Sequence, residues 1–207
     1  MKVLMINASP HEKGCTYTAL SEIAKTLTEE GVESEIVHIG TSMKHPCIGC
    51  RACAKAGKCV FDDDILNECV EKMKEADGFI IGEPVYYAGP ASQAQMFMDR
   101  AFFSSASKFA FKPAAAVASC RRGGLTATMD RMNKYFTISQ MPIVSSNYWN
   151  GVHGNTPEEV MQDKEGLQVM RILARNMAWM LKCIDAAKKA GVEYPKQEEK
   201  IRTNFIR

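Results

Sequence analysis

Long apolar runs and a strong charge of either sign are both missing from the sequence. No run approaches the roughly 18–20 apolar residues that a helix needs to cross a bilayer. The opening segment turns polar at Asn7, too early for a secretory signal. Lysine and arginine total 26 against 24 aspartate and glutamate residues, without the basic block that follows a phosphate backbone. We therefore expect a cytoplasmic protein with no membrane and no nucleic acid among its partners.

Several signatures of nucleotide binding and catalysis are missing too. The sequence holds neither G-x-G-x-x-G nor G-x-x-x-x-G-K-[ST], which disfavours a tightly held nicotinamide dinucleotide and a nucleoside triphosphatase. H-E-x-x-H and G-x-S-x-G are also absent, and the 4 histidines build no acid–base set with the carboxylates. The composition is otherwise that of a globular chain, with 46% hydrophobic and 24% charged residues.

Short apolar runs alternate with helical stripes along the chain. The runs predict five buried strands, at residues 2–7, 35–39, 78–82, 114–118 and 142–144. Apolar residues spaced by three and four predict helices near residues 20–27, 64–76, 93–103, 125–136 and 167–184. This alternation predicts an α/β fold, a doubly wound five-stranded parallel sheet with helices on both faces. We expect one domain over residues 1–207, with a cysteine-rich insertion at 43–61 after the second strand and a C-terminal helix and tail at 165–207.

Such sheets bind their ligands at the carboxyl ends of the strands, so the loops after Asn7, Gly82 and Ala118 are the expected functional loops. The first of them carries two hydroxyl residues, Ser9 and Thr16, and leads into a helix. Free amides at a helix start, together with hydroxyls, suit a phosphate monoester. The alternative is an ordinary loop in which Thr16 caps the helix and no ligand binds.

The first loop and the segment after the third strand resemble a known family. Ser-Pro-x-x-x-Gly-x-Thr after Val-Leu-x-Ile-Asn, at residues 3–16, is similar to the phosphate-binding loop of the NAD(P)H-dependent FMN reductase family, which has a flavodoxin-like fold. Residues 82–100 resemble the segment of that family that lies against the flavin ring. Glu83 and Gln95 replace the usual hydroxyl residue and lysine, so the resemblance assigns no side-chain hydrogen bond at either position.

A third segment, residues 119–124, follows the fourth strand where the family supplies another loop beside the flavin. Its paired glycines let main-chain amides approach the ring edge, and Arg121 is suited to stabilise a reduced, anionic flavin. Alternatively, Arg121 and Arg122 are solvated surface charges. Together the three segments imply FMN contacts at Ser9, Pro10, Gly14, Cys15, Thr16, Pro84, Val85, Tyr86, Tyr87, Gly89, Ser119, Arg121, Gly123 and Gly124.

Half of the 8 cysteines are gathered in the insertion. Cys47, Cys50, Cys53 and Cys59 have the spacing C-x2-C-x2-C-x5-C, close to the compact run that holds iron–sulfur clusters in bacterial ferredoxins. Structural zinc usually takes two separated C-x2-C pairs. The spacing favours a [4Fe–4S] cluster, while free thiols, a redox disulfide and zinc remain alternatives. The same motif is typical of iron–sulfur flavoproteins, a branch of this family in which a cluster passes electrons to FMN across a subunit contact.

The remaining cysteines and the acidic run have simpler interpretations. Cys15 and Cys120 lie in loops beside the expected flavin. Cys69 and Cys183 are expected on helices, with their side chains in the hydrophobic core. Residues 62–64 form an aspartate run that is expected to be a helix cap and a solvated turn, with Asp64 as the cap. The aromatic residues Tyr148 and Trp149, with His153, are candidates for the entrance of the flavin site, where they would shape a substrate pocket. The alternative is that they form an interface or a lid.

The sequence thus predicts an FMN-dependent oxidoreductase in which the flavin carries the redox chemistry and no dedicated acid–base residue is needed. NAD(P)H or a ferredoxin-like protein is the expected electron donor, and a quinone, a flavin or another small molecule the acceptor. One alternative is a flavodoxin-like electron carrier without a substrate of its own. Another is a zinc or thiol interaction module. The resemblance further implies a homodimer or homotetramer.

Overall fold

A parallel sheet forms the centre of the computed structural model, which describes residues 1–206. Its five parallel strands are β1 (Lys2–Asn7), β2 (Glu33–His38), β3 (Gly78–Tyr86), β5 (Ala114–Cys120) and β6 (Gly151–His153). They are ordered β2-β1-β3-β5-β6, and the short strand β4 (Gly89–Pro90) pairs antiparallel with the end of β3. This arrangement confirms the predicted five-stranded parallel sheet.

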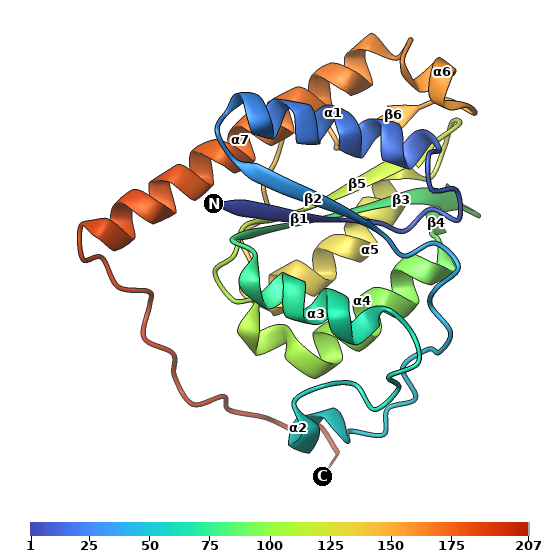
Figure 1. Ribbon diagram of the computed structural model, residues 1–207. Coiled ribbons are helices and arrows are strands. Elements are labelled where there is room, and N and C mark those ends of the chain that lie inside the picture. The colour runs from blue at the N-terminus through green and yellow to red at the C-terminus, as the bar shows by residue number, and fades with distance from the viewer. Residues whose placement is uncertain (207) are drawn as a thin grey trace.

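Helices cover both faces of the sheet, as predicted (Figure 1). One face carries α1 (Cys15–Glu29) and α7 (Lys164–Lys189), and the other carries α3 (Leu66–Glu75), α4 (Ser92–Ser105) and α5 (Leu125–Ile138). Short turns of helix occur at α2 (Cys53–Ala56), η1 (Ala106–Lys108) and α6 (Pro157–Val160). Within residues 1–206, no helix combines the length and the apolar character needed to span a bilayer.

Two apolar cores lie on the two faces of the sheet, because successive residues of a buried strand point in opposite directions. Val3 and Met5 pack in the core under α1 and α7, whereas Leu4 and Ile6 pack in the core under the other helices. Cys69 is buried in α3, as predicted, but Cys183 in α7 is exposed, so its predicted core position is wrong. It lies two residues beyond the buried Leu181, about 200° around the helix and off the buried stripe.

The predicted strand at residues 142–144 is also wrong. It makes only an isolated parallel bridge between Ala114 and Ile143, and the fifth strand is β6. Pro142 has no amide to donate to a ladder, and beyond Val144 the chain leaves the sheet, where the Ser146 hydroxyl donates to the Val169 carbonyl of α7. Two segments therefore pair with this edge of β5: Ile143 through a single bridge, and β6 as a strand.

The segment expected as a loop after Gly82 is part of a hairpin. β3 continues to Tyr86 and then pairs with β4 through Val85–Pro90 and Tyr86–Gly89. Tyr87 and Ala88 form its turn, with φ angles of +49° and +57°. Two consecutive positive φ angles are the geometry of the tight turns that match the twist of a hairpin. We call residues 84–90 the β3–β4 hairpin.

Candidate functional site

A cavity of about 270 Å³ opens at the carboxyl ends of β1, β3 and β5. β2 and β3 lie on opposite sides of β1, so the winding reverses here, as it does where doubly wound sheets bind their ligands. Residues from all three predicted functional loops line the cavity. Those that the family resemblance assigns to FMN are Ser9, Cys15, Thr16, Pro84, Val85, Tyr86, Ser119 and Arg121. Four further residues line it: Cys120, which was expected in a loop beside the flavin, and His11, Gly154 and Asn155, which were not assigned to FMN.

Helix α1 begins at this cavity without a side chain that caps it. Its N-cap residue is Gly14, no side chain accepts from the first amides, and no acidic residue lies in the first turn. Thr16 is therefore inside the helix rather than its cap, and its hydroxyl lies 2.8 Å from the buried Ser119 hydroxyl. Unopposed amides at the positive end of a helix dipole, beside two hydroxyls, form a site suited to a phosphate.

The six other residues assigned to FMN do not line this cavity. Gly14 precedes α1, and Tyr87 is fully exposed at the hairpin tip. Gly124, with a φ of +94°, packs on the hairpin so tightly that an added Cβ would lie 2.5 Å from the Ala88 Cα. The three remaining residues are Pro10, Gly89 and Gly123. At Gly124 the loop after β5 is thus in direct contact with the β3–β4 hairpin.

Glu83 is a buried acid directly before the hairpin. Its side chain is 0% exposed, and neither carboxyl oxygen has a hydrogen-bond partner. Burial raises the pKa of Glu83 well above its usual value, and the nearby Ala91 amide and Arg131 charge oppose this only in part. Burial therefore favours the neutral form of the carboxyl group that stands at the family's hydroxyl position.

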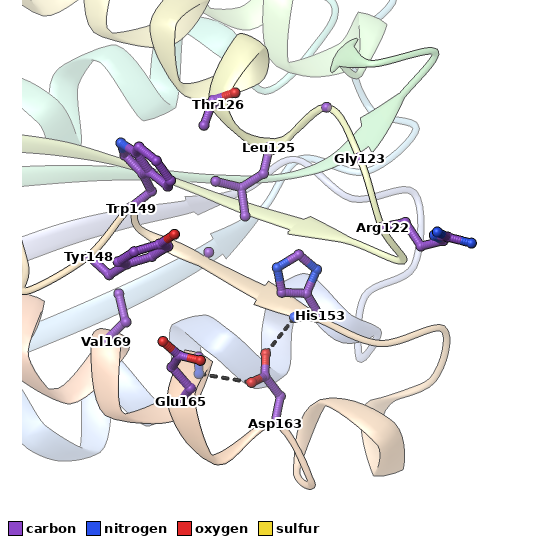
Figure 2. Close-up of a pocket in the computed structure, with 13 residues that line it drawn as sticks. Arg122, Gly123, Leu125, Thr126, Tyr148, Trp149, His153, Asp163, Glu165 and Val169 are labelled. Atoms are coloured by element: carbon purple, nitrogen blue, oxygen red, sulfur yellow. Dashed lines mark hydrogen bonds between the residues drawn. The ribbon is translucent and has the colours of Figure 1, made fainter.

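A second cleft, of about 430 Å³, lies at the outer edge of β6 (Figure 2). Tyr148 and Trp149 stand on one side of it, with ring centroids 4.6 Å apart, and His153 stands on the other. Asp163 accepts hydrogen bonds from the amides of His153, at 2.7 Å, and of Gly166, at 2.9 Å. This aspartate caps both the edge strand and α7. Asp163 is not among the residues predicted from the sequence, although an aspartate directly before a helical stripe is an ordinary N-cap signal.

Only a short piece of backbone separates the two cavities. Cys120 lines the first and His153 lines the second, and the Cys120 Sγ lies 3.4 Å from the His153 Nδ1. Burial raises the pKa of the Cys120 thiol, and the negative charge of Asp163 adds to the effect. Burial likewise raises the pKa of the Cys15 thiol. Both cysteines beside the first cavity are therefore neutral thiols at neutral pH rather than thiolate nucleophiles.

The four clustered cysteines meet around one small cavity on the side of the molecule that carries α2. Cys47, Cys50, Cys53 and Cys59 all line it. Burial raises the pKa of the Cys53 thiol, and the other three sulfurs are close enough to raise it further. In residues 1–206, no three His, Cys, Asp or Glu side chains are placed to hold a single metal ion. A cubane differs from a single ion because it presents a separate iron to each thiolate.

Asn67 and Arg100 hold the insertion in place, and neither residue was predicted from the sequence. The Asn67 side chain accepts from the Cys59 amide at 3.1 Å and donates to the Cys59 carbonyl at 3.0 Å. Arg100 reaches from α4 to an ion pair with Asp64 and to the Cys59 sulfur. α3 begins two residues beyond Asp64, although the Leu66 amide still donates to that carboxylate. Asp64 is therefore buried, and only its neighbours form the solvated turn that was predicted.

The sheet order and the site at its carboxyl edge define a flavodoxin-like α/β protein. A flavodoxin from the domain Archaea has the same fold, with a TM-score of 0.61 and 15% identity over 88% of this chain and 99% of that one. A flavone reductase gives a TM-score of 0.71 at 16% identity, over 90% of this chain and 65% of that one. These likenesses concern the fold.

The family follows from the sequence match. The model of the family described as NADPH-dependent FMN reductase matches residues 1–156, and the chain belongs to this family. It is 35% identical to an iron–sulfur flavoprotein of Methanocaldococcus jannaschii, over 89% of this chain and 99% of that protein. The chain is thus one of the FMN-binding, flavodoxin-like oxidoreductases.

Proposed function

We propose that the chain is an FMN-dependent oxidoreductase that takes electrons from NAD(P)H or a ferredoxin-like protein and reduces a quinone, a flavin or another small acceptor. The single observation that carries the proposal is the cavity at the winding reversal, with its uncapped helix start and convergent hydroxyls. FMN, when bound, supplies the redox chemistry, because flavins accept and release electrons that side chains do not.

The residues that line the cavity fit the two ends of FMN. We assign the phosphate to the amides at the start of α1, with the hydroxyls of Ser9 and Thr16 beside them. We assign the ring to the β3–β4 hairpin and the loop after β5, where main-chain groups and small residues allow a close approach. Arg121, on the wall of the same cavity, supplies a positive charge that favours a reduced, anionic ring.

We further propose that the four clustered cysteines hold a [4Fe–4S] cluster. Their sulfurs surround one cavity, and all four are free. Thiolate donors are the ligands that such clusters require. By analogy with the iron–sulfur flavoproteins, the cluster would exchange electrons with FMN in a homodimer or homotetramer.

Cofactor content tests the proposal directly. Protein purified without oxygen should show flavin absorption bands and a broad iron–sulfur shoulder, with about four iron and four sulfide per chain, as a cubane requires. The Cys50→Ser variant should lose the shoulder, the iron and the sulfide while its flavin bands stay, because one of four ligands is gone.

Cys183→Ser is the matched control, because Cys183 is an exposed thiol on α7. It should keep iron, sulfide and flavin at the level of the unchanged protein. Absence of flavin after reconstitution with FMN contradicts the flavin proposal. Stoichiometric zinc, or no metal at all, contradicts the cluster and favours the thiol module. Bound flavin without turnover of any acceptor favours the electron carrier.

The second cleft is the proposed site of an aromatic acceptor. Tyr148 and Trp149 expose 58% and 55% of their surfaces there, which suits stacking against a planar molecule. Trp149→Ala should raise the KM for a quinone up to about tenfold, because an aromatic contact contributes about 0.5–1.5 kcal/mol. The FMN content should not change, since Trp149 does not line the first cavity. Steady-state kinetics with NAD(P)H and a quinone measure the effect.

Trp179 offers a matched control on α7, since it is the only other tryptophan in the chain and is also exposed. Trp179→Ala should leave the quinone KM unchanged. An equal rise in both variants, or no rise for Trp149→Ala, rules out this cleft as the acceptor site.

A further inference from the structure

Arg100 is the largest side chain that is fully buried, and every N–H of its guanidinium has an acceptor. Nε donates to the Cys59 Sγ at 3.3 Å. Nη1 donates to the His45 carbonyl at 3.2 Å and Nη2 to the Phe61 carbonyl at 3.1 Å. The two remaining N–H groups face the two carboxylate oxygens of Asp64. Five donors with five partners fix the guanidinium in one orientation.

Stability alone does not account for this buried pair. Taking an arginine and an aspartate out of water costs several kcal/mol per ion, and apolar residues of similar size often stabilise a protein as well or better. His45 lies shortly before Cys47, the first of the four cysteines, and Phe61 lies shortly after Cys59, the last of them. The pair therefore closes the insertion around the cavity that the four cysteines line, and it directs one N–H at a sulfur.

We propose that Arg100 raises the reduction potential of the iron–sulfur cluster through its Nε–H bond to Cys59, and that Asp64 limits this effect by offsetting the charge of the guanidinium. The inference rests on the proposed cluster. Reduction adds one electron, which increases the negative charge on the sulfur ligands. A hydrogen bond or positive charge at a sulfur stabilises the reduced form, so the potential rises. A nearby carboxylate lowers the reduction potential, because its negative charge destabilises the reduced form.

The test compares two variants whose expected shifts have opposite signs. Arg100→Lys keeps a positive charge but loses the planar fork that places Nε–H at the sulfur. Its potential should fall, with roughly a tenfold change in the reduction equilibrium, about 59 mV for one electron. Asp64→Asn keeps an oxygen acceptor for the guanidinium and removes the negative charge, so its potential should rise. Both are measured by anaerobic redox titration followed by electron paramagnetic resonance.

The FMN midpoint potential is an internal reference and should stay constant in both variants. Arg171→Lys is the matched control: Arg171 is paired with Glu22 at 2.6 Å, on helices across the sheet from the cysteines. It should not change the cluster potential. If Arg100→Lys fails to fold, the Asp64→Asn variant alone tests the proposal: a rise in the cluster potential supports it, and a fall or no change contradicts it.

Three results separate the possible failures. Lack of iron and sulfide in the unchanged protein overturns the proposed cluster, and with it this inference. If the unchanged protein and all variants contain the cluster at the same potential, the inference about Arg100 and Asp64 is overturned and the proposed cluster stands. Shifts of the same sign in Arg100→Lys and Asp64→Asn also overturn it, because loosening of the insertion would explain them without a hydrogen bond to sulfur.

Discussion

Gly124→Ala is expected to weaken FMN binding roughly tenfold or more. Gly124 has a φ of +94°, where a residue with a Cβ costs about 1–3 kcal/mol. The added Cβ would lie 2.5 Å from the Ala88 Cα and 2.7 Å from the Val85 Cγ1, so the loop after β5 must move away from the β3–β4 hairpin. Val85 lines the first cavity, so this movement distorts the proposed flavin site. Fluorescence titration of the apoprotein with FMN measures the loss.

A glycine outside the proposed flavin site provides the control. Gly31, just after the end of α1, also has a positive φ, of +74°, but an added Cβ there would meet no atom within 4 Å. Gly31→Ala should therefore bind FMN as the unchanged protein does, because Gly31 does not line the first cavity. Equal FMN affinity for Gly124→Ala and the unchanged protein would show that the contact between the two loops does not shape the flavin site.

Asp64→Ala is expected to lower the free energy of unfolding by about 3–5 kcal/mol, because it leaves the buried charge of Arg100 without its partner. Burial alone would raise the pKa of Asp64, but hydrogen bonds from Arg100 and from the Lys44 and Leu66 amides lower it overall. A carboxyl with a lowered pKa in the folded state stabilises the protein above its unfolded pKa. Its contribution is lost as the pH falls through the folded pKa. Urea unfolding at neutral and acidic pH measures both effects.

Asp63 directly precedes Asp64 and serves as the comparison. Its side chain is 56% exposed and pairs with the exposed Lys44 and the partly exposed His45, so Asp63→Ala should change stability by no more than about 0.5 kcal/mol. The difference between the Asp64→Ala and unchanged proteins should shrink as the pH falls. A similar small effect of both substitutions at neutral pH would contradict the role given to the buried ion pair.

The fold could be predicted from the sequence where burial leaves a strong pattern. β1, β3 and β5 are buried on both faces and therefore appear as apolar runs, and α7 repeats its buried residues over 26 positions. β6 has only 3 residues, at the sheet edge, and two of them are Gly151 and His153. No periodicity can show in so short a strand. The run at 142–144 looked more like a strand than the real one.

The candidate site could be predicted only in part. Its loops follow from strand order and from a motif, but side-chain contacts depend on partners far along the chain. The three aspartates at 62–64 are alike in sequence, and only folding brings Arg100, 36 positions away, to Asp64. Glu83 differs from the family pattern in the sequence itself, but its burial and the raised pKa of its carboxyl group became evident only from the structure.

Helix α4 follows the β3–β4 hairpin almost at once, starting at Ser92, and carries Arg100. Arg100 lies eight positions beyond Ser92, which is about 12 Å along the axis at the rise of an α-helix. Helix α4 therefore connects the β3–β4 hairpin, at the wall of the proposed flavin site, to Arg100 and its contacts with the cysteine insertion. A single inserted residue in this stretch would turn Arg100 by about 100° away from Cys59. The distance between the proposed flavin site and the cysteine insertion is thus set by the number of residues in one helix, and a single insertion or deletion there would break the contact between Arg100 and Cys59.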